Sequence, residues 1–327
     1  MKQIVLTLFL MFNVFLSFGQ SKIFLNQNLT PVKAEKRAHY FITTKQGKKI
    51  GGNFRHIIYF KNGQVYSIFN TKKPNFNQTK EGPFITYFQN GNKRLEGEYR
   101  QSVKVGIWKQ YHENGLVNLE YEIEYEQIPN NPKMLLLNGW DTLGNQTLKD
   151  GQGYVKYIAT KSSDLKISNK QNLVIVEGQV KKYKRDKVWK GKYLTGEKYF
   201  EETYSKGKLK KGISWDKNEN QFSYTRVIVP PVFPGGMAEF YKQVRRKFEY
   251  PQEAKMNGEQ GKVYIRFIVQ PTGKLSNFKV MRGVSPSINE EALRVMNLVP
   301  DWEPRKVKGQ PVTSTVVIPI IFNLGSQ

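Results

Sequence analysis

The chain has 327 residues, which allows about two domains of ordinary size. Hydrophobic residues make up 39% of it and aromatic residues 13%, so there is enough apolar material for packed cores and wholesale disorder is excluded. Cysteine is absent, which excludes disulfides, thiolate metal sites and cysteine nucleophiles. The net charge of +25 makes the protein strongly basic.

The first nineteen residues have the pattern of a secretory signal peptide. Lys2 precedes an apolar run, 4–18, that is shorter than the roughly 20 residues of a transmembrane helix. Ser17 and Gly19 place small residues at the −3 and −1 positions of a cleavage site, so we expect cleavage before Gln20. The alternative is an uncleaved inner-membrane anchor. In both cases we expect an exported chain in the periplasm or cell envelope.

Internal repetition characterises the region 56–226, which follows an N-terminal segment, 20–55. Positions recur at a period of 24 residues and again at a longer offset of 81 residues. Self-similarity of this kind is typical of stacked supersecondary units, so we expect a repeat domain. The short period relates Gly82, Tyr87, Gly91, Leu95 and Glu96 to Gly106, Tyr111, Gly115, Leu119 and Glu120, and the long offset relates Gly97 and Trp108 to Gly178 and Trp189.

Each repeat is predicted to form β-hairpins. Asn62-Gly63, Asn90-Gly91 and Asn114-Gly115 are typical of tight turns with positive φ, and the surrounding aromatic and β-branched residues suit a half-buried sheet. The segments 82–91 and 106–115 resemble MORN-type repeats, which are common in exported bacterial proteins. This resemblance implies a scaffold or an interaction surface. We expect the glycine and aromatic positions to serve packing, and the alternative for them is direct contact with a ligand.

A basic cluster occupies 181–192, with seven Lys or Arg residues and one Asp. One interpretation is a binding surface for an anionic partner, and the other is the solvated face of a hairpin. Nucleic acid is not expected as a partner, because no nucleic-acid-binding motif accompanies the charge.

A change of composition at Pro230-Pro231 indicates a second domain over 227–327. The order helix, strand, strand, helix, strand predicts a small α+β sheet with helices on one face. A capping box of Ser287 and Glu290 is expected to open the second helix. The fold class is therefore expected to be mainly β with α+β, an N-terminal β-hairpin repeat domain followed by a small α+β domain. The apolar positions behind this prediction are Met237, Phe240, Tyr241, Val244 and Phe248 on the first helix, 263–269 and 274–282 as a hairpin, Ile288, Ala292, Val295 and Val299 on the second helix, and 316–322 as the last strand.

The C-terminal domain contains a series of motifs at 231–236, Tyr250-Pro251, 261–263, Gly273, 291–293, 302–304, Gly309 and 319–322. In this order they resemble the TonB C-terminal domain in the form typical of Bacteroidota. The resemblance implies that the domain captures an extended segment of an outer-membrane receptor by adding it to a sheet edge, as part of energy-coupled transport. A TonB-dependent receptor or a similar envelope protein is the implied partner, with inner-membrane motor proteins as further partners if the anchor is retained.

The candidate edge is the segment 312–322, because an edge strand offers unpaired N–H and C=O groups. Pro319 has no N–H, so we expect pairing to use the residues before it. Glu249 and Tyr250 are further candidates for partner contact, although Glu249 stands where the family often has a neutral polar residue. For Tyr250, Trp302 and Phe322 the alternative is core packing. The predicted edge residues are Val312, Thr313, Ser314, Thr315, Val316, Val317 and Ile318.

A folded repeat, and not an extended Pro-rich spacer, precedes the C-terminal domain, and Pro numbers only 15 in the chain. This keeps open a second function, a non-transporting periplasmic scaffold or adaptor that uses both domains for protein–protein interaction. The sequence has no nucleophile elbow, P-loop, dinucleotide fingerprint or HExxH motif, so we expect no catalytic residues, no cofactor, no metal and no enzymatic activity.

Overall fold

The computed structural model describes residues 22–43, 49–50, 52–127, 130–160 and 173–324. The predicted signal peptide lies outside these residues. The chain divides into two compact units, one of residues 1–175 and 179–184 and the other of residues 176–178 and 185–327. Within the described residues, no helix has the length and apolar character needed to cross a membrane.

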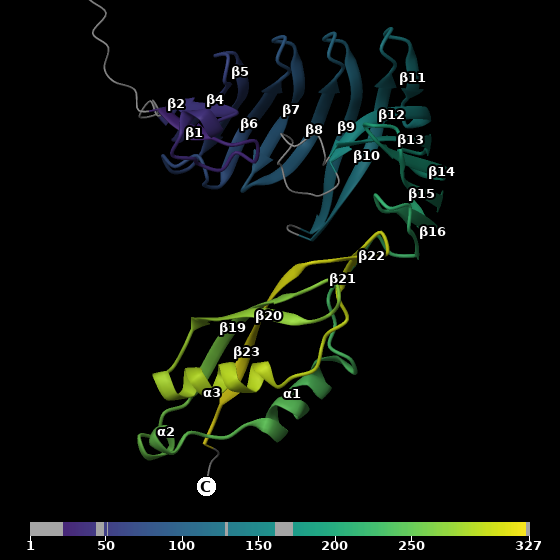
Figure 1. Ribbon diagram of the computed structural model, residues 1–327. Helices are drawn as coiled ribbons and strands as arrows, with labels where there is room; N and C mark the ends of the chain where they lie inside the picture. Colours follow the sequence, from purple (N-terminus) through teal and green to yellow (C-terminus); the bar gives the residue numbers. More distant parts are fainter. Residues whose placement is uncertain (1–21, 44–48, 51, 128–129, 161–172, 325–327) are drawn as a thin grey trace, which may run out of the picture. The chain divides into compact units, whose positions relative to one another are not determined.

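The first unit is built from antiparallel strands that follow one another as hairpins (Figure 1), as predicted. Pairing runs in the order β1, β2, β4, β5, β6, β7, β8, β9, β10, β11, β12, with β3 paired to β4. A short 3₁₀ helix, Glu35–Arg37, precedes β2. The strands are β1 (Lys22–Leu25), β2 (Tyr40–Thr43), β3 (Lys49–Ile50), β4 (Asn53–Phe60), β5 (Val65–Thr71), β6 (Lys80–Tyr87), β7 (Lys93–Arg100), β8 (Val103–Tyr111), β9 (Val117–Gln127), β10 (Asn130–Trp140), β11 (Gln146–Lys149) and β12 (Gln152–Thr160); β13 (Leu173–Lys181) contains residues of both units.

The Asn-Gly dipeptides lie in hairpin turns, but only their glycines have positive φ. Gly91 has φ 89°, and its N–H donates to the carbonyl of Phe88 at 3.1 Å. The Phe88 N–H in turn donates to the carbonyl of Asn92 at 2.8 Å, which leaves three residues in the loop and places the glycine at the bulge position. Asn90 Nδ2 donates to the carbonyl of Glu113 in the following turn at 2.7 Å, so successive turns are tied together.

The sequence offset of 81 residues corresponds to a contact between a glycine and a tryptophan ring that occurs in each unit. Trp108 is fully buried, and its ring lies so close to Gly97 that a Cβ atom there would be 2.2 Å from it. In the second unit, Gly178 and the fully buried Trp189 repeat this approach, with a Cβ at 2.4 Å from the ring. A side chain of any size is excluded at both glycines, because real Cβ atoms do not approach a ring so closely.

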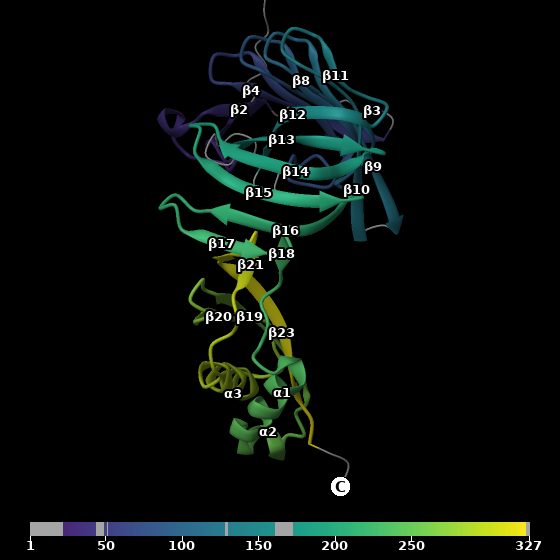
Figure 2. The ribbon, with the colours of Figure 1, turned by 90° about the vertical axis from the view of Figure 1, so that its right-hand side faces the viewer.

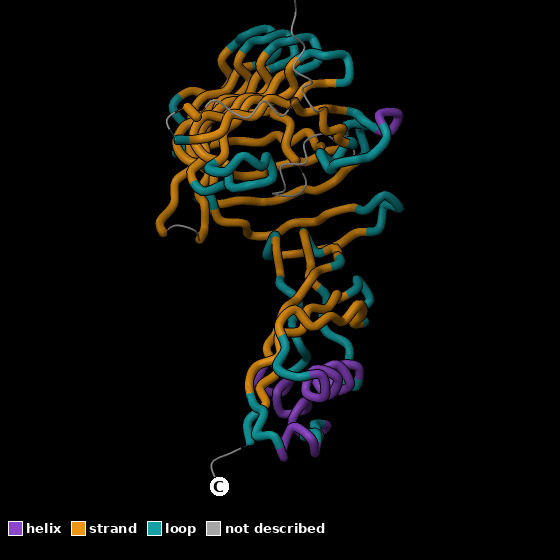
Figure 3. The backbone as a smooth tube through the Cα atoms, turned by 90° about the vertical axis from the view of Figure 1, so that its left-hand side faces the viewer, coloured by secondary structure: helices purple, strands orange, loops and turns teal. Residues whose placement is uncertain are grey.

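The second unit begins with four antiparallel strands and continues into an α+β domain, which holds the α-helices (Figures 2 and 3). That domain contains one sheet in the order β20, β19, β23 and another in the order β18, β21, β22. The elements are β14 (Lys184–Tyr193), β15 (Lys198–Ser205), β16 (Lys208–Trp215), β17 (Gln221–Tyr224), β18 (Ile228–Val229), α1 (Gly236–Lys247), α2 (Gln252–Met256), β19 (Gly261–Val269), β20 (Leu275–Arg282), α3 (Pro286–Asn297), β21 (Arg305–Val307), β22 (Gln310–Val312) and β23 (Ser314–Phe322).

Helices α1 and α3 cover one face of the β20–β19–β23 sheet (Figure 1). Trp302 lies in this core, with ring centroids 5.4–5.8 Å from those of Phe233, Phe240 and Phe267. Trp302 is 5% exposed and Phe322 is 1% exposed, so the core-packing alternative is confirmed for both.

The predicted order of helices and strands is confirmed, and the structure adds α2 and the β21–β22 hairpin. The predicted capping box is wrong. Helix α3 begins at Pro286 after the N-cap Ser285, and no side chain caps it, so Ser287 already lies in the first turn. The reason is that proline, with its fixed φ and missing N–H, is favoured at the first helical position.

Candidate functional site

Strand β23 is an edge strand. It pairs with β19 in unbroken register, from Ser314 opposite Val269 to Phe322 opposite Gly261. Within the described residues, no strand pairs with the other side of β23. One row of its main-chain N–H and C=O groups is therefore open to an incoming chain.

Pro319 identifies the residues whose main-chain N–H and C=O groups point to the open side of β23. It has no N–H to give to β19, and its carbonyl accepts a hydrogen bond from the hydroxyl of Tyr241 on α1 at 3.2 Å. Proline in a sheet places its nitrogen on the unpaired side of an edge strand. Because N–H and C=O groups alternate between the two sides of a strand, Thr315, Val317 and Ile321 present theirs to the open edge as well.

The same residues carry side chains on the face that the helices do not cover. Val317 is 52% exposed and Ile321 is 58% exposed, whereas Ile318 and Ile320 are buried in the core. The residues that offer main-chain groups to an added strand, such as Val317 and Ile321, therefore also offer it exposed apolar side chains.

Strand β20 forms the opposite edge of this sheet and is irregular. Its pairing with β19 shifts register twice, and Asn277 has φ 56°. Such bulges are a common means of protecting an edge from pairing. Since β23 has an unbroken register, it is the edge that suits strand addition.

Five of the seven predicted edge residues lie on β23, from Ser314 to Ile318. Val312 instead ends β22, where it pairs with Arg305, and Thr313 lies between the two strands. The open part of the predicted segment is therefore the first half of β23.

The structure places Glu249 and Tyr250 away from that half. The Tyr250 ring packs against Phe248 and Phe322, at centroid distances of 5.8 and 5.9 Å, and its hydroxyl donates to the Glu259 carbonyl. Phe322 ends β23, so these two candidates lie at the far end of the strand from Ser314. The Glu249 side chain is 84% exposed, while Tyr250 belongs to the edge of the core.

The β21–β22 hairpin, whose tip carries Lys308, was not predicted from the sequence. Its ammonium pairs with the carboxylate of Glu202 on β15, a side chain with 0% exposure. The hydroxyls of Tyr224 and Tyr204 donate to the same carboxylate at 2.7 and 2.9 Å, and Arg185 Nη1 lies 3.3 Å from it. Burial alone would raise the pKa of Glu202, but the charge of Lys308 and these hydrogen bonds hold the pKa below its ordinary value.

Further contacts surround this ion pair within the second unit. Lys308 Nζ lies 3.8 Å from the centroid of the Phe200 ring, and the Lys308 carbonyl accepts a hydrogen bond from Ser214 at 2.7 Å. Gln310 Nε2 donates to Ser214 Oγ at 2.9 Å and to the Trp215 carbonyl at 3.0 Å. Figure 2 shows β21 beside β17 at this junction.

No group of three or more histidine or acidic side chains suited to a metal ion occurs in the part of the chain that the structure describes. The candidate site on β23 is a main-chain edge with exposed apolar side chains, a geometry that suits an added polypeptide strand.

The model of the family "Gram-negative bacterial TonB protein C-terminal" matches residues 246–324. Two NMR structures of the Helicobacter pylori TonB C-terminal domain are similar to this chain, with 23% and 25% identity. They cover 28% and 29% of this chain and 96% and 89% of their own, with TM-scores of 0.23 and 0.22. No curated protein matches the chain. On the family match, residues 246–324 form a domain of the TonB C-terminal family.

Proposed function

We propose that the C-terminal domain binds an extended segment of an outer-membrane receptor by strand addition to the open side of β23. The family of the domain supports a TonB-like role in energy-coupled transport in the cell envelope. The observation that supports strand addition in this chain is the unbroken edge of β23, open from Ser314 to Ile318.

An added strand would form its hydrogen bonds with Thr315 and Val317, whose N–H and C=O groups point outward. Pro319 would end this ladder, because it has no N–H and its carbonyl is already bonded to Tyr241. The exposed side chain of Val317 would contact alternate side chains of the partner and contribute selectivity.

The test is a calorimetric titration of the full chain with a synthetic peptide from the extended segment of a TonB-dependent receptor of the same cell. We expect saturable one-to-one binding, and at least tenfold weaker binding of a peptide with the same composition in scrambled order. Equal binding of both peptides would count against a receptor-binding function.

A second candidate function is a non-transporting scaffold or adaptor. The hairpin β21–β22 is folded against β15, β16 and β17 through Lys308, Gly309 and Gln310, which favours a compact assembly over a domain carried on an extended spacer. Intact-mass and N-terminal analysis of fractionated cells separates the two functions. A soluble chain beginning at Gln20 supports the adaptor, and a chain beginning at Met1 in the inner membrane supports the transducer.

A further inference from the structure

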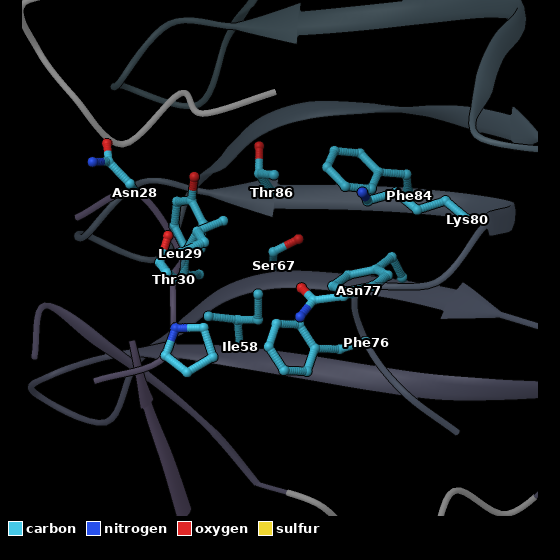
Figure 4. A pocket seen from close by; sticks show the side chains of 13 residues that line it. Asn28, Leu29, Thr30, Ile58, Ser67, Phe76, Asn77, Lys80, Phe84 and Thr86 are labelled. Carbon is cyan, nitrogen blue, oxygen red and sulfur yellow. The ribbon is translucent and has the colours of Figure 1, made fainter. Parts of the chain in front are cut away.

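The first unit contains a cavity of about 470 Å³ that is lined by side chains from three strands and two loops (Figure 4). Its floor consists of two rows of side chains on β4, β5 and β6. Ile58, Ser67 and Thr86 lie opposite one another across the three strands, and Phe69 lies opposite Phe84 in the next row. All of the described residues that line the cavity belong to this unit.

The roof of the cavity comes from the chain between β1 and β2 and from the chain between β5 and β6. Leu29 lies in the first of these loops, and Phe76 and Asn77 lie in the second. Together with Phe69 and Phe84, they give the cavity mainly apolar and aromatic walls. Its volume lies within the ~300–1,000 Å³ of pockets that bind small molecules.

Thr86 provides the first sign that the cavity can accept a polar group. Its side chain is 2% exposed and lines the cavity, yet its hydroxyl has no hydrogen-bond partner within the described residues. By contrast, the neighbouring Ser67 hydroxyl donates to the Ile85 carbonyl at 3.2 Å. A buried hydroxyl without a partner is costly, and a polar group on a bound molecule would remove that cost.

Lys80 provides the second sign, because it alone is charged among the described residues that line the cavity. Its ammonium lies 5.4 Å from the centroid of the Phe69 ring and 5.9 Å from that of Tyr99, and no described carboxylate forms an ion pair with it. A cation that is partly removed from water and lacks an acidic partner favours an anion in the adjoining space.

We propose that this cavity binds a small organic monocarboxylate with an aromatic or otherwise flat apolar body. The carboxylate pairs with Lys80, the body packs against Phe69, Phe76 and Phe84, and a second polar group on the ligand bonds to the hydroxyl of Thr86. Lys80 and Thr86 both belong to β6 with Phe84 between them, so one ligand lying along that strand can meet all three. The proposal is independent of receptor binding at β23.

Three related fluorescent probes test the proposal on the full chain: 6-hydroxy-2-naphthoate, its carboxamide, and 2-naphthoate. We expect one-to-one binding of 6-hydroxy-2-naphthoate, at least tenfold weaker binding of the carboxamide, and severalfold weaker binding of 2-naphthoate. Absence of saturable binding, or equal affinity for the acid and the carboxamide, would overturn the proposal.

Variants assign each contact. Lys80→Met should remove the preference for the acid over the carboxamide, and Lys80→Arg should retain it. Thr86→Val, which keeps the shape of the side chain, should remove the preference for 6-hydroxy-2-naphthoate over 2-naphthoate. Lys93→Met changes an exposed lysine on β7 outside the cavity and should alter neither preference. If Lys93→Met has the same effect as Lys80→Met, the attraction comes from the net charge of the protein and the site is refuted; thermal denaturation shows whether each variant is folded.

Discussion

The ammonium of Lys308 pairs with the carboxylate of Glu202, which lies 106 residues earlier in the chain and is buried with 0% exposure. A carboxylate in this position is stable only because it is paired and fully hydrogen-bonded. The pair therefore joins the TonB-family part of the second unit to β15, and its loss should affect the stability of that unit as a whole.

Lys308→Met tests this role. The substitution leaves the buried Glu202 carboxylate without its closest cation, and breaking a buried pair in this way costs about 3–5 kcal/mol. We expect a loss of this size in the free energy of unfolding, measured by urea denaturation with tryptophan fluorescence. Lys93→Met breaks the exposed pair with Glu96 and is the matched control, with an expected loss below about 1 kcal/mol. Similar losses in both variants would show that the Lys308 pair is no more than a surface contact.

The same pair predicts a dependence on pH. The pKa of Glu202 is held below its ordinary value, so its ionised form stabilises the folded state above the unfolded pKa of about 4.3. This contribution is lost as the pH falls through the lower pKa of the folded state. The stability difference between the native protein and Glu202→Gln should therefore be largest near pH 6 and narrow towards pH 3. A difference that stays constant over this range would contradict the assignment.

Gly97→Ala tests the glycine–tryptophan contact that occurs within each unit. The new Cβ would lie 2.2 Å from the Trp108 ring, and overpacking of this kind costs about 1–3 kcal/mol. Gly178→Ala should have a similar cost, because Trp189 lies 2.4 Å from the same position there. In a Trp108→Leu background the cost of Gly97→Ala should shrink, and additive losses in the double variant would show that the ring is not the cause.

Most of the C-terminal domain could be predicted from the sequence, because hydrophobic residues recur along its helices and strands with the period of each element. Val263, Ile265, Phe267 and Val269 occupy every second position, and all four are buried on β19. The hairpin β21–β22 has no such period over its three-residue strands, and its main stabilising partner is far away in the sequence. The one local signal was Lys308-Gly309, where both residues have positive φ, as a tight turn requires.

The candidate edge was only partly predictable. Alternation indicated a strand up to Phe322, but the sequence could not show that Val312 pairs in a different sheet from Ser314. The cavity of the first unit was not predicted either, because its walls come from three strands and two loops. Thr86 and Lys80 have no unusual sequence context. Only the buried, unbonded hydroxyl of Thr86 and the absence of a described carboxylate paired with Lys80 distinguish them.

The measurement that tests the central claim most directly compares two proline substitutions on β23. Val317→Pro and Ile321→Pro each remove one outward N–H from an exposed position of the same strand, on opposite sides of Pro319. In the receptor-peptide titration we expect Val317→Pro to weaken binding at least tenfold and Ile321→Pro to change it less than twofold, with both variants folded by circular dichroism. Weaker binding for Ile321→Pro alone, or unchanged binding for both, would contradict strand addition along the first half of β23.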